Sequence, residues 1–333
     1  MLLIAAIPWI VFPRGAGPLS VTGPYGVAQT LVTLTDASRD ETYGPVGESR
    51  RVAVGVWYPS GRSGATMTPT DTHPLVVFSH GSLGVLDSNE SLYRELASHG
   101  YVVAAIGHAY QALFVTDTAG RTTWIDSGYL RELQGENAKA DPAASLALYR
   151  KWLGVRMGDI GFVIDCVLDR AVAEVSLLVD PLRIAVVGHS LGGSAALGVG
   201  RVRRDVAAVV ALEAPLLADL VGVVDGEFVI DPSPYPVPVL NVYSDDTWGR
   251  LSELPQYAGN VALLASREDV VAENVHIEGS RHLGLTDLAL SSPLLMRLLG
   301  GGRQAVAAEE VLGEVNRLVV GFLGRRLGGV GGE

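Results

Sequence analysis

Short apolar runs and helical patterns alternate along most of the chain. Residues 27–36 and 51–58 switch regularly between apolar and polar side chains, which is typical of strands with one exposed face. The stretch between them, 37–49, contains Gly and Pro and is expected to be a hairpin loop. The pattern therefore predicts that two antiparallel strands begin the fold.

The later strands are expected to be buried on both faces, because their apolar runs are continuous. They are predicted at 75–78, 101–106, 183–187, 206–212, 237–243 and about 274–278. Helical spacing predicts helices at 88–99, 141–177 and about 191–202, and a mostly helical segment from the last strand to Leu327. Asp141 and Pro142 have the residue types of an N-cap and a first helical position. Strands that alternate with helices imply right-handed crossovers and a parallel sheet, an α/β arrangement with helices on both faces.

No repeat and no linker divides the chain. We expect residues 1–21 to form an apolar N-terminal segment and lead-in, 22–327 a single domain, and 328–333 a Gly-rich tail. An insertion at about 214–236 and the loops at 108–130 are expected to overhang the carboxyl edge of the sheet.

Residues 1–12 are almost entirely apolar and lead into Pro13-Arg14-Gly15. This run is shorter than the roughly 20 residues that a membrane-spanning helix needs. It also lacks the basic region and the small-residue cleavage site of a signal peptide. Three interpretations stay open: the end of a longer membrane segment, a weak signal or anchor, or an element packed on the domain. We expect membrane association or export through residues 1–13, or otherwise a cytoplasmic protein.

Composition narrows the classes of function. The 333 residues carry a formal net charge of −11, which disfavours a nucleic-acid partner because phosphate binding needs a basic surface. The single cysteine, Cys166, rules out an internal disulfide and lies in an apolar helical stretch. No His-Glu-x-x-His, paired-cysteine or acidic calcium-loop motif occurs in the sequence, so we expect neither a metal nor a cofactor. The oligomeric state is not set by the sequence.

One stretch concentrates the candidate chemistry. An apolar run, 184–187, leads into Gly188-His189-Ser190-Leu191-Gly192, and small residues then follow in a helical pattern. A strand, a sharp turn and a helix in this order push a serine hydroxyl out of the sheet. Glycines on both sides leave room for the crossing backbone, and the start of the helix favours negative charge. The motif predicts Ser190 as a nucleophile.

A serine nucleophile needs a base and an oxyanion site. His282 follows the last predicted strand in Gly-Ser-Arg-His, and the chain order serine, acid, histidine requires a base near the C-terminus. His80, in the turn after the third strand, is expected to brace that turn. We assign the two oxyanion donors to the backbone N–H groups of Leu191 and Ser82.

Three carboxylates compete for the role of the triad acid, which must end a strand beside the histidine loop. Glu213 ends the strand directly after the nucleophile unit, and Asp245 and Asp246 end the following strand. Many enzymes with this arrangement use the later position, and adjacent acids are also common in solvated loops. The residues alone leave all three open.

These motifs resemble those of the α/β-hydrolase superfamily, and in particular serine esterases around platelet-activating-factor acetylhydrolase and the dienelactone-hydrolase-like enzymes. The resemblance covers most of residues 22–299. It rests on Gly23-Pro24-Tyr25, Val56-Trp57-Tyr58-Pro59, Phe78-Ser79-His80-Gly81, Gly188-His189-Ser190-Leu191-Gly192-Gly193 and Gly279-Ser280-Arg281-His282. It implies the α/β-hydrolase fold, with a mostly parallel eight-stranded sheet and an antiparallel N-terminal hairpin, and it implies hydrolysis of carboxylic esters.

The resemblance also bears on the acid and on the substrate. The acetylhydrolases take their acid after the strand that follows the nucleophile, in a Leu-Asp context, where this chain has Leu212-Glu213. This favours Glu213, although the residue is Glu rather than Asp. A dienelactone hydrolase would be expected to carry a cysteine nucleophile, so the serine argues against that activity.

We expect the substrate to be a neutral ester, from a short-acyl ester to a lipid-like or polyester chain, because no cationic cluster is visible in the sequence. Trp124 and Trp248 are candidate pocket walls. An acyltransferase would use the same triad, and a non-catalytic binding protein on this fold would usually have lost the serine or the histidine.

Overall fold

The computed structural model describes residues 17–62, 72–265, 272–299 and 304–328. Residues 1–13 and 329–333 lie outside this part of the chain, so the interpretations of the apolar N-terminal segment stay predictions. Within the described ranges, no helix combines the length and the apolar character needed to cross a membrane.

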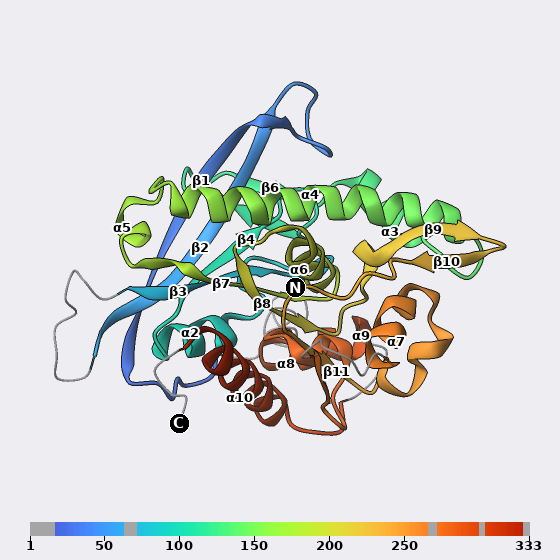
Figure 1. The fold of residues 1–333 in the computed structure, drawn as a ribbon. Helices are drawn as coiled ribbons and strands as arrows, with labels where there is room; N and C mark the ends of the chain where they lie inside the picture. Colours follow the sequence, from blue (N-terminus) through green and yellow to red (C-terminus); the bar gives the residue numbers. More distant parts are fainter. Residues whose placement is uncertain (1–16, 63–71, 266–271, 300–303, 329–333) are drawn as a thin grey trace, which may run out of the picture.

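A central sheet of eight strands organises the fold (Figure 1). Its strands are β1 (Tyr25–Asp40), β2 (Ser49–Arg62), β3 (His73–Ser79), β4 (Val102–Gly107), β7 (Val179–His189), β8 (Val206–Leu212), β11 (Val239–Tyr243) and β12 (Ala272–His276). Their order is β1-β2-β4-β3-β7-β8-β11-β12. The first two pairs are antiparallel and the remaining pairs are parallel. This confirms the predicted mostly parallel eight-stranded sheet with an antiparallel N-terminal hairpin.

Helices and two small hairpins surround the sheet. The α-helices are α2 (Glu90–Ser98), α3 (Ser127–Gly135), α4 (Pro142–Leu168), α5 (Ala173–Ser176), α6 (Leu191–Val202), α7 (Ala258–Ala265), α8 (Leu288–Ser291), α9 (Pro293–Leu299) and α10 (Ala308–Leu327). Short 3-10 helices are η1 (Leu217–Asp219), η2 (Trp248–Glu253), η3 (Pro255–Tyr257) and η4 (His282–Leu285). The hairpins pair β5 (Phe114–Thr116) with β6 (Thr122–Trp124), and β9 (Leu220–Val224) with β10 (Glu227–Ile230).

The sheet separates two apolar cores. Along β3, Leu75 and Val77 pack on one face with α4 and α6, whereas Val76 and Phe78 pack on the other face with α2 and α10. Successive side chains of a strand point to opposite faces, so a continuous apolar run fills both cores. Figure 1 shows α4 over one face and α10 below the other, as expected for helices on both faces.

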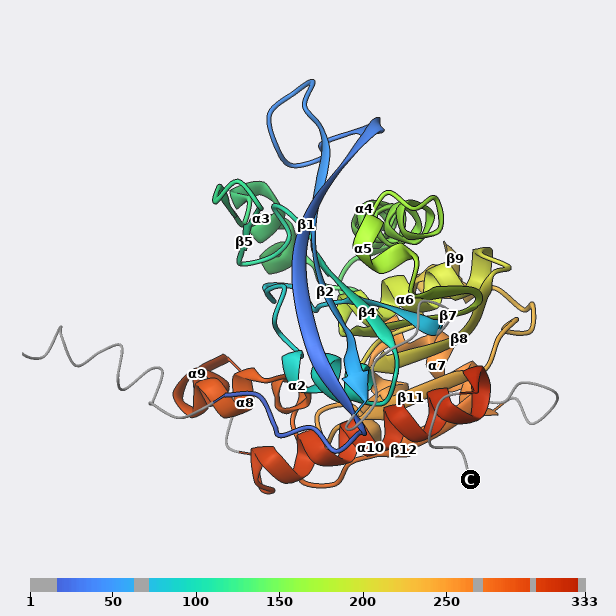
Figure 2. The same cartoon turned by 90° about the vertical axis from the view of Figure 1, so that its left-hand side faces the viewer.

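Several boundaries agree with the sequence, and others differ for physical reasons. The strand 206–212 and the helix 191–202 have the predicted bounds. Asp141 caps α4 as predicted, because its carboxylate accepts a hydrogen bond from the Ala144 N–H at 2.9 Å. The N-terminal hairpin extends past its predicted ends and projects beyond the body of the sheet (Figure 2). The short strands of β5 and β6, within a region expected to be loop and short helices, carry too few residues to show a period.

A buried ionic network attaches the N-terminal hairpin to α4. Asp159 on α4 accepts two hydrogen bonds from Arg50 on β2, at 3.0 and 2.6 Å, and one from Arg39 at 3.0 Å. Arg50 also pairs with Glu41 at 2.8 Å. His108, directly after β4, contacts Asp159 through Nδ1 at 2.8 Å. Burial alone would raise the pKa of Asp159, but Arg50 and His108 outweigh it and hold the pKa well below its usual range.

Substitution Asp159→Asn is expected to destabilise the fold by about 3–5 kcal/mol, because it leaves the buried Arg50 charge only partly compensated. Urea unfolding followed by circular dichroism measures this change. The exposed pair of Glu314 and Arg317 supplies the control, since Glu314→Gln is expected to change stability by less than about 1 kcal/mol. Equal effects of the two substitutions would contradict the role given to Asp159.

Candidate active site

Ser190 lies on a strained turn between β7 and α6. Its backbone has φ 53° and ψ −126°, a conformation that residues with a side chain rarely adopt. The Ser190 N–H donates to the Leu212 carbonyl at 2.9 Å, and the Ser190 carbonyl accepts from the Ser194 N–H at 3.0 Å. Leu191 is the first residue of α6, so its N–H is one of the free donors at the start of that helix.

Two glycines allow this turn to pack on the end of β3. A Cβ atom on Gly188 would lie 2.4 Å from the Gly192 carbonyl carbon, and one on Gly192 would lie 2.0 Å from the Ser79 carbonyl oxygen. Neither separation is possible for a real side chain. The glycines of the motif are therefore required by the close approach of two backbone segments.

We name residues 80–84, which follow β3, the oxyanion turn, after the donor that the sequence predicts there. A Cβ atom on Gly81 would lie 3.2 Å from the Ser190 Cβ, so this turn borders the serine directly. The Gly84 N–H closes it by donating to the Gly81 carbonyl at 3.1 Å. The structure thus brings together the predicted serine and the segment that carries the predicted Ser82 donor. The Ser82 hydroxyl contacts the Tyr129 hydroxyl at 3.0 Å.

His80 braces the oxyanion turn, as expected from the sequence. Its Nδ1–H donates to the Gly81 carbonyl at 2.7 Å, and its Nε2 lies 3.5 Å from the His108 N–H. Burial, assisted by the charge of Arg156, holds the pKa of His80 well below its usual range. The ring is therefore neutral, and it serves as a structural donor and acceptor.

The loop after β12 places His282 against the turn that carries Ser190. The His189 Nε2–H donates to the His282 carbonyl at 3.0 Å, and the two rings have centroids 4.6 Å apart. Burial lowers the pKa of His282 to about 4, and the negative charge of Asp246 acts in the opposite direction. Among the described residues, the His282 ring makes no hydrogen bond to Ser190 or to a carboxylate.

Glu213 is a buried carboxylate without a cationic partner in the described part of the chain. It follows β8 at a positive φ of 51°. One of its oxygens accepts from the Ser244 N–H and the other from the Thr247 hydroxyl, the latter at 2.6 Å. Burial raises its pKa, and these hydrogen bonds oppose the shift.

The two aspartates after β11 hold the loop after β12. Asp245 accepts from the His276 ring at 2.8 Å and from the Gly279 N–H at 3.1 Å. Asp246 accepts from the His282 N–H at 2.7 Å and pairs with the Arg281 guanidinium at 3.0 Å. Their carboxylates therefore fix the backbone on which His282 stands.

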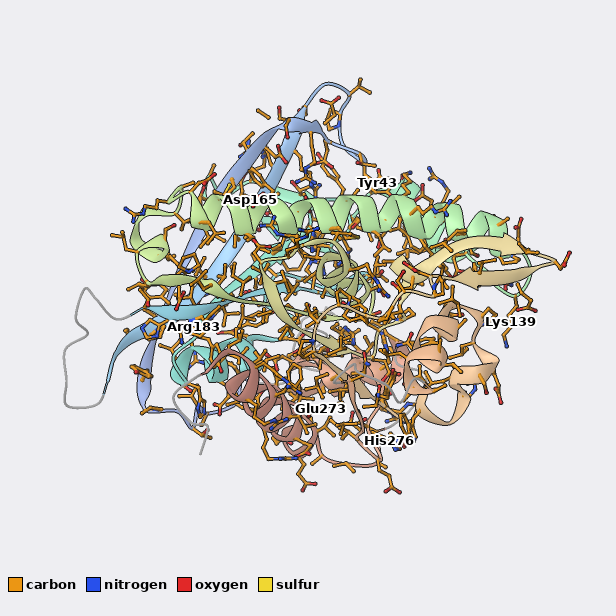
Figure 3. The ribbon with its side chains drawn as sticks, viewed as in Figure 1. Tyr43, Lys139, Asp165, Arg183, Glu273 and His276 are labelled. Atoms are coloured by element: carbon orange, nitrogen blue, oxygen red, sulfur yellow. The ribbon has the colours of Figure 1, made fainter. Side chains whose placement is uncertain are left out.

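The two predicted pocket tryptophans lie in different places. Trp124, which is 62% exposed, packs on Phe114 in the β5–β6 hairpin. That hairpin is attached to the oxyanion turn, because the Leu113 N–H donates to the Gly84 carbonyl at 2.9 Å. Trp248 instead stacks on His276 at 5.5 Å. His276 ends β12, the last strand of the sheet, and Figure 3 shows it near the bottom of the view, away from α4.

Arg156 on α4 was not assigned a role from the sequence, although it contacts the oxyanion turn. Its guanidinium donates to the carbonyls of His80 and Gly81, and the side chain is fully buried. The signal in the sequence is Arg156 and Asp159, two charges one turn apart in an otherwise apolar stretch of helix.

No group of three His, Cys, Asp or Glu side chains suited to a metal occurs among the described residues.

Comparisons with known proteins show what this chain is similar to. Residues 48–133 match the sequence profile of platelet-activating factor acetylhydrolase, isoform II. A platelet-activating factor acetylhydrolase of Bos taurus is 24% identical over 78% of this chain and 58% of its own length. The chain has the α/β-hydrolase fold and is similar to platelet-activating factor acetylhydrolases over part of its length.

Further relatives agree with this relationship. The acetylhydrolase of Canis lupus familiaris is 30% identical over 38% of this chain and 32% of its own length. A solved ferulic acid esterase from Streptomyces cinnamoneus covers 92% of both chains with a TM-score of 0.67 and 24% identity, which supports the fold. The chain spans 58% of the length of the Bos taurus acetylhydrolase and about a third of the length of the one from Canis lupus familiaris.

The low pKa of His282 gives a direct prediction. In an NMR titration, its imidazole signal is expected to shift with a midpoint near pH 4, because burial disfavours the charged ring. The ring is then neutral, and able to accept a proton, throughout the neutral range. Removing the nearby charge with Asp246→Asn is expected to lower the midpoint further.

A His282→Gln variant identifies the signal. A midpoint at or above the ordinary value of 6.5 would contradict the enclosed position of the ring.

Proposed function

We propose that this α/β-hydrolase cleaves neutral carboxylic esters through an acyl-enzyme intermediate on Ser190. The observation that carries the proposal is the positive φ of Ser190 at the start of α6, directly beside the oxyanion turn. The names of the related acetylhydrolases and of the structurally similar esterase support the same reaction class.

The proposed reaction begins when the Ser190 Oγ attacks the ester carbonyl carbon and gives its proton to His282. The carbonyl oxygen becomes an oxyanion and accepts hydrogen bonds from the N–H groups of Leu191 and Ser82. Collapse of this intermediate breaks the bond to the alcohol, which leaves with the proton from His282. A water molecule then hydrolyses the acyl-enzyme by the same steps, and the acid is released.

We assign Glu213 as the triad acid. Its carboxylate is buried at the end of the strand next to the nucleophile strand and is oriented by two donors. No cation of the described residues pairs with it. Asp245 and Asp246 are already bound to the loop that follows β12. In this proposal the His282 ring turns toward Glu213 when substrate binds, while Asp246 keeps the backbone of that loop in place.

The surroundings of the oxyanion turn favour an apolar substrate. Leu83 in this turn is 44% exposed, and Phe114 and Trp124 in the attached hairpin are 40% and 62% exposed. Contiguous exposed apolar side chains are typical of ligand or interaction sites. We therefore propose that Trp124 contacts the substrate, from a short-acyl ester to a lipid-like chain. Trp248 stacks on His276 instead and is left out of this site.

A series of nitrophenyl esters of increasing acyl length tests the activity. The wild type is expected to release nitrophenol, and Ser190→Ala is expected to lower kcat by about 10⁶-fold because the nucleophile is lost. Ser194→Ala, on the next turn of the same helix, is the matched control and is expected to retain turnover. No release from any ester would contradict the proposal, and transfer of the acyl group to an added alcohol in preference to water would identify an acyltransferase.

The acid assignment predicts unequal effects of two isosteric substitutions. Glu213→Gln is expected to lower kcat by about 10⁴-fold with the fold intact, because the imidazolium loses its partner. Asp246→Asn keeps a hydrogen-bond acceptor for the His282 N–H and is expected to cause a much smaller loss. Steady-state kinetics and circular dichroism of both variants decide the assignment. Near-normal turnover of Glu213→Gln, with a large loss in Asp246→Asn, would transfer the role to Asp246.

A further inference from the structure

A fully buried arginine lies behind the oxyanion turn, on the side of α4. The Arg156 Nε donates to the Gln111 side-chain oxygen at 2.9 Å. Its Nη1 donates to the His80 carbonyl and its Nη2 to the Gly81 carbonyl, the latter at 3.4 Å. No carboxylate of the described residues lies within ion-pair distance of this guanidinium.

The neighbouring Arg50 shows how unusual this environment is. Arg50 is also buried, but Glu41 and Asp159 compensate its charge directly. A buried charge is strongly disfavoured unless it is paired and hydrogen-bonded. For Arg156, two backbone carbonyls of the oxyanion turn, the Gln111 side-chain oxygen and the Ser79 hydroxyl take the place of carboxylates in direct contact. The guanidinium and the oxyanion turn therefore hold each other.

The geometry of the peptide bond gives this contact a direction. In a trans peptide group, the carbonyl and the following N–H point to opposite sides. A guanidinium that binds the carbonyls of His80 and Gly81 therefore turns the N–H groups of Gly81 and Ser82 away from α4. Ser190 borders the same turn, since a Cβ atom on Gly81 would lie 3.2 Å from its Cβ.

Three further contacts keep the turn in this orientation. The His80 Nδ1–H and the Gly84 N–H also donate to the Gly81 carbonyl, at 2.7 and 3.1 Å. The Ser82 hydroxyl is held by the Tyr129 hydroxyl at 3.0 Å. Arg156 is the only charged group among these partners, and hydrogen bonds to an ionised donor are roughly twice as strong as neutral ones.

We propose that Arg156 is a positioning residue for the oxyanion hole. It fixes the peptide groups that join residues 80, 81 and 82, so that the Ser82 N–H faces the oxyanion formed at Ser190. Its positive charge also polarises these peptide groups and strengthens their N–H groups as donors to a negative oxygen. This inference rests on the proposed ester hydrolysis by Ser190.

Arg156→Met and Arg156→Lys test the proposal in the full chain. Reactive serine is titrated to completion with a fluorophosphonate, so that kcat is expressed per folded site. Arg156→Met is expected to lower kcat by about 10²-fold with KM changed less than about twofold, comparable with the loss of one oxyanion donor. The inhibition constant of a trifluoromethyl ketone, whose serine adduct carries an oxyanion, is expected to rise by the same factor. Arg156→Lys keeps the positive charge but lacks the planar guanidinium. Its kcat and its inhibition constant are therefore expected to lie between those of the wild type and those of Arg156→Met.

Arg201→Met is the matched control. Arg201 also binds backbone carbonyls, those of Ser233 and Pro234, but it pairs with Asp219 as well and lies at the far end of α6 from Ser190. It is expected to change stability and to leave kcat and the inhibition constant unchanged.

The outcomes separate the two proposals. A wild type that neither turns over esters nor reacts with the fluorophosphonate would refute the proposed function. An active wild type with unchanged kcat and inhibition constant in Arg156→Met would refute the positioning role alone. If Arg156→Met yields no reactive serine, the same comparison is made with Arg156→Lys, and wild-type values there would also refute the role.

Discussion

The site depends on the close approach of two backbone turns. The turn that carries Ser190 and the end of β3 touch through the position of Gly192, where a side chain would overlap the Ser79 carbonyl. Parallel strands end at the same edge of a sheet, so neighbouring β3 and β7 deliver both turns to one place. Because this contact is between main chains, it leaves little freedom in the distance between Ser190 and the oxyanion turn.

The buried ionic network that joins the N-terminal hairpin to α4 also supports the contact between these two turns. The Ser79 hydroxyl bonds the His108 ring, which in turn bonds Asp159, and Asp159 bonds Arg50 of the N-terminal hairpin. Burial lowers the pKa of His108 to about 4, so this ring is neutral and links a carboxylate to a hydroxyl. Hydrogen-bond chains of this kind rigidify a core when every member is satisfied. The hairpin is thus connected to the edge of the sheet where Ser190 lies.

The local sequence predicted the bounds of uniformly buried elements. It did not predict the roles of residues that depend on contacts between distant segments of the chain. The strand 206–212 and the helix 191–202 were predicted with the observed bounds because apolar patterning and small residues specify them. The Ser190 turn was predictable because its glycines meet a steric requirement. The role of Asp246 on the His282 loop and the contact of Arg156 with the oxyanion turn were not, since both join segments far apart in the chain. The stacking of Trp248 on His276 also needed the tertiary fold.

The paired anchors of the His282 loop have a consequence for how related chains vary. Asp245 and Asp246 bind this loop at both Gly279 and His282, so the segments after β11 and β12 share their hydrogen bonds. A change in the length of one segment would break the contacts of the other. The two segments therefore form one unit of exchange: a chimera with a related esterase preserves the position of the histidine only when both are transferred together.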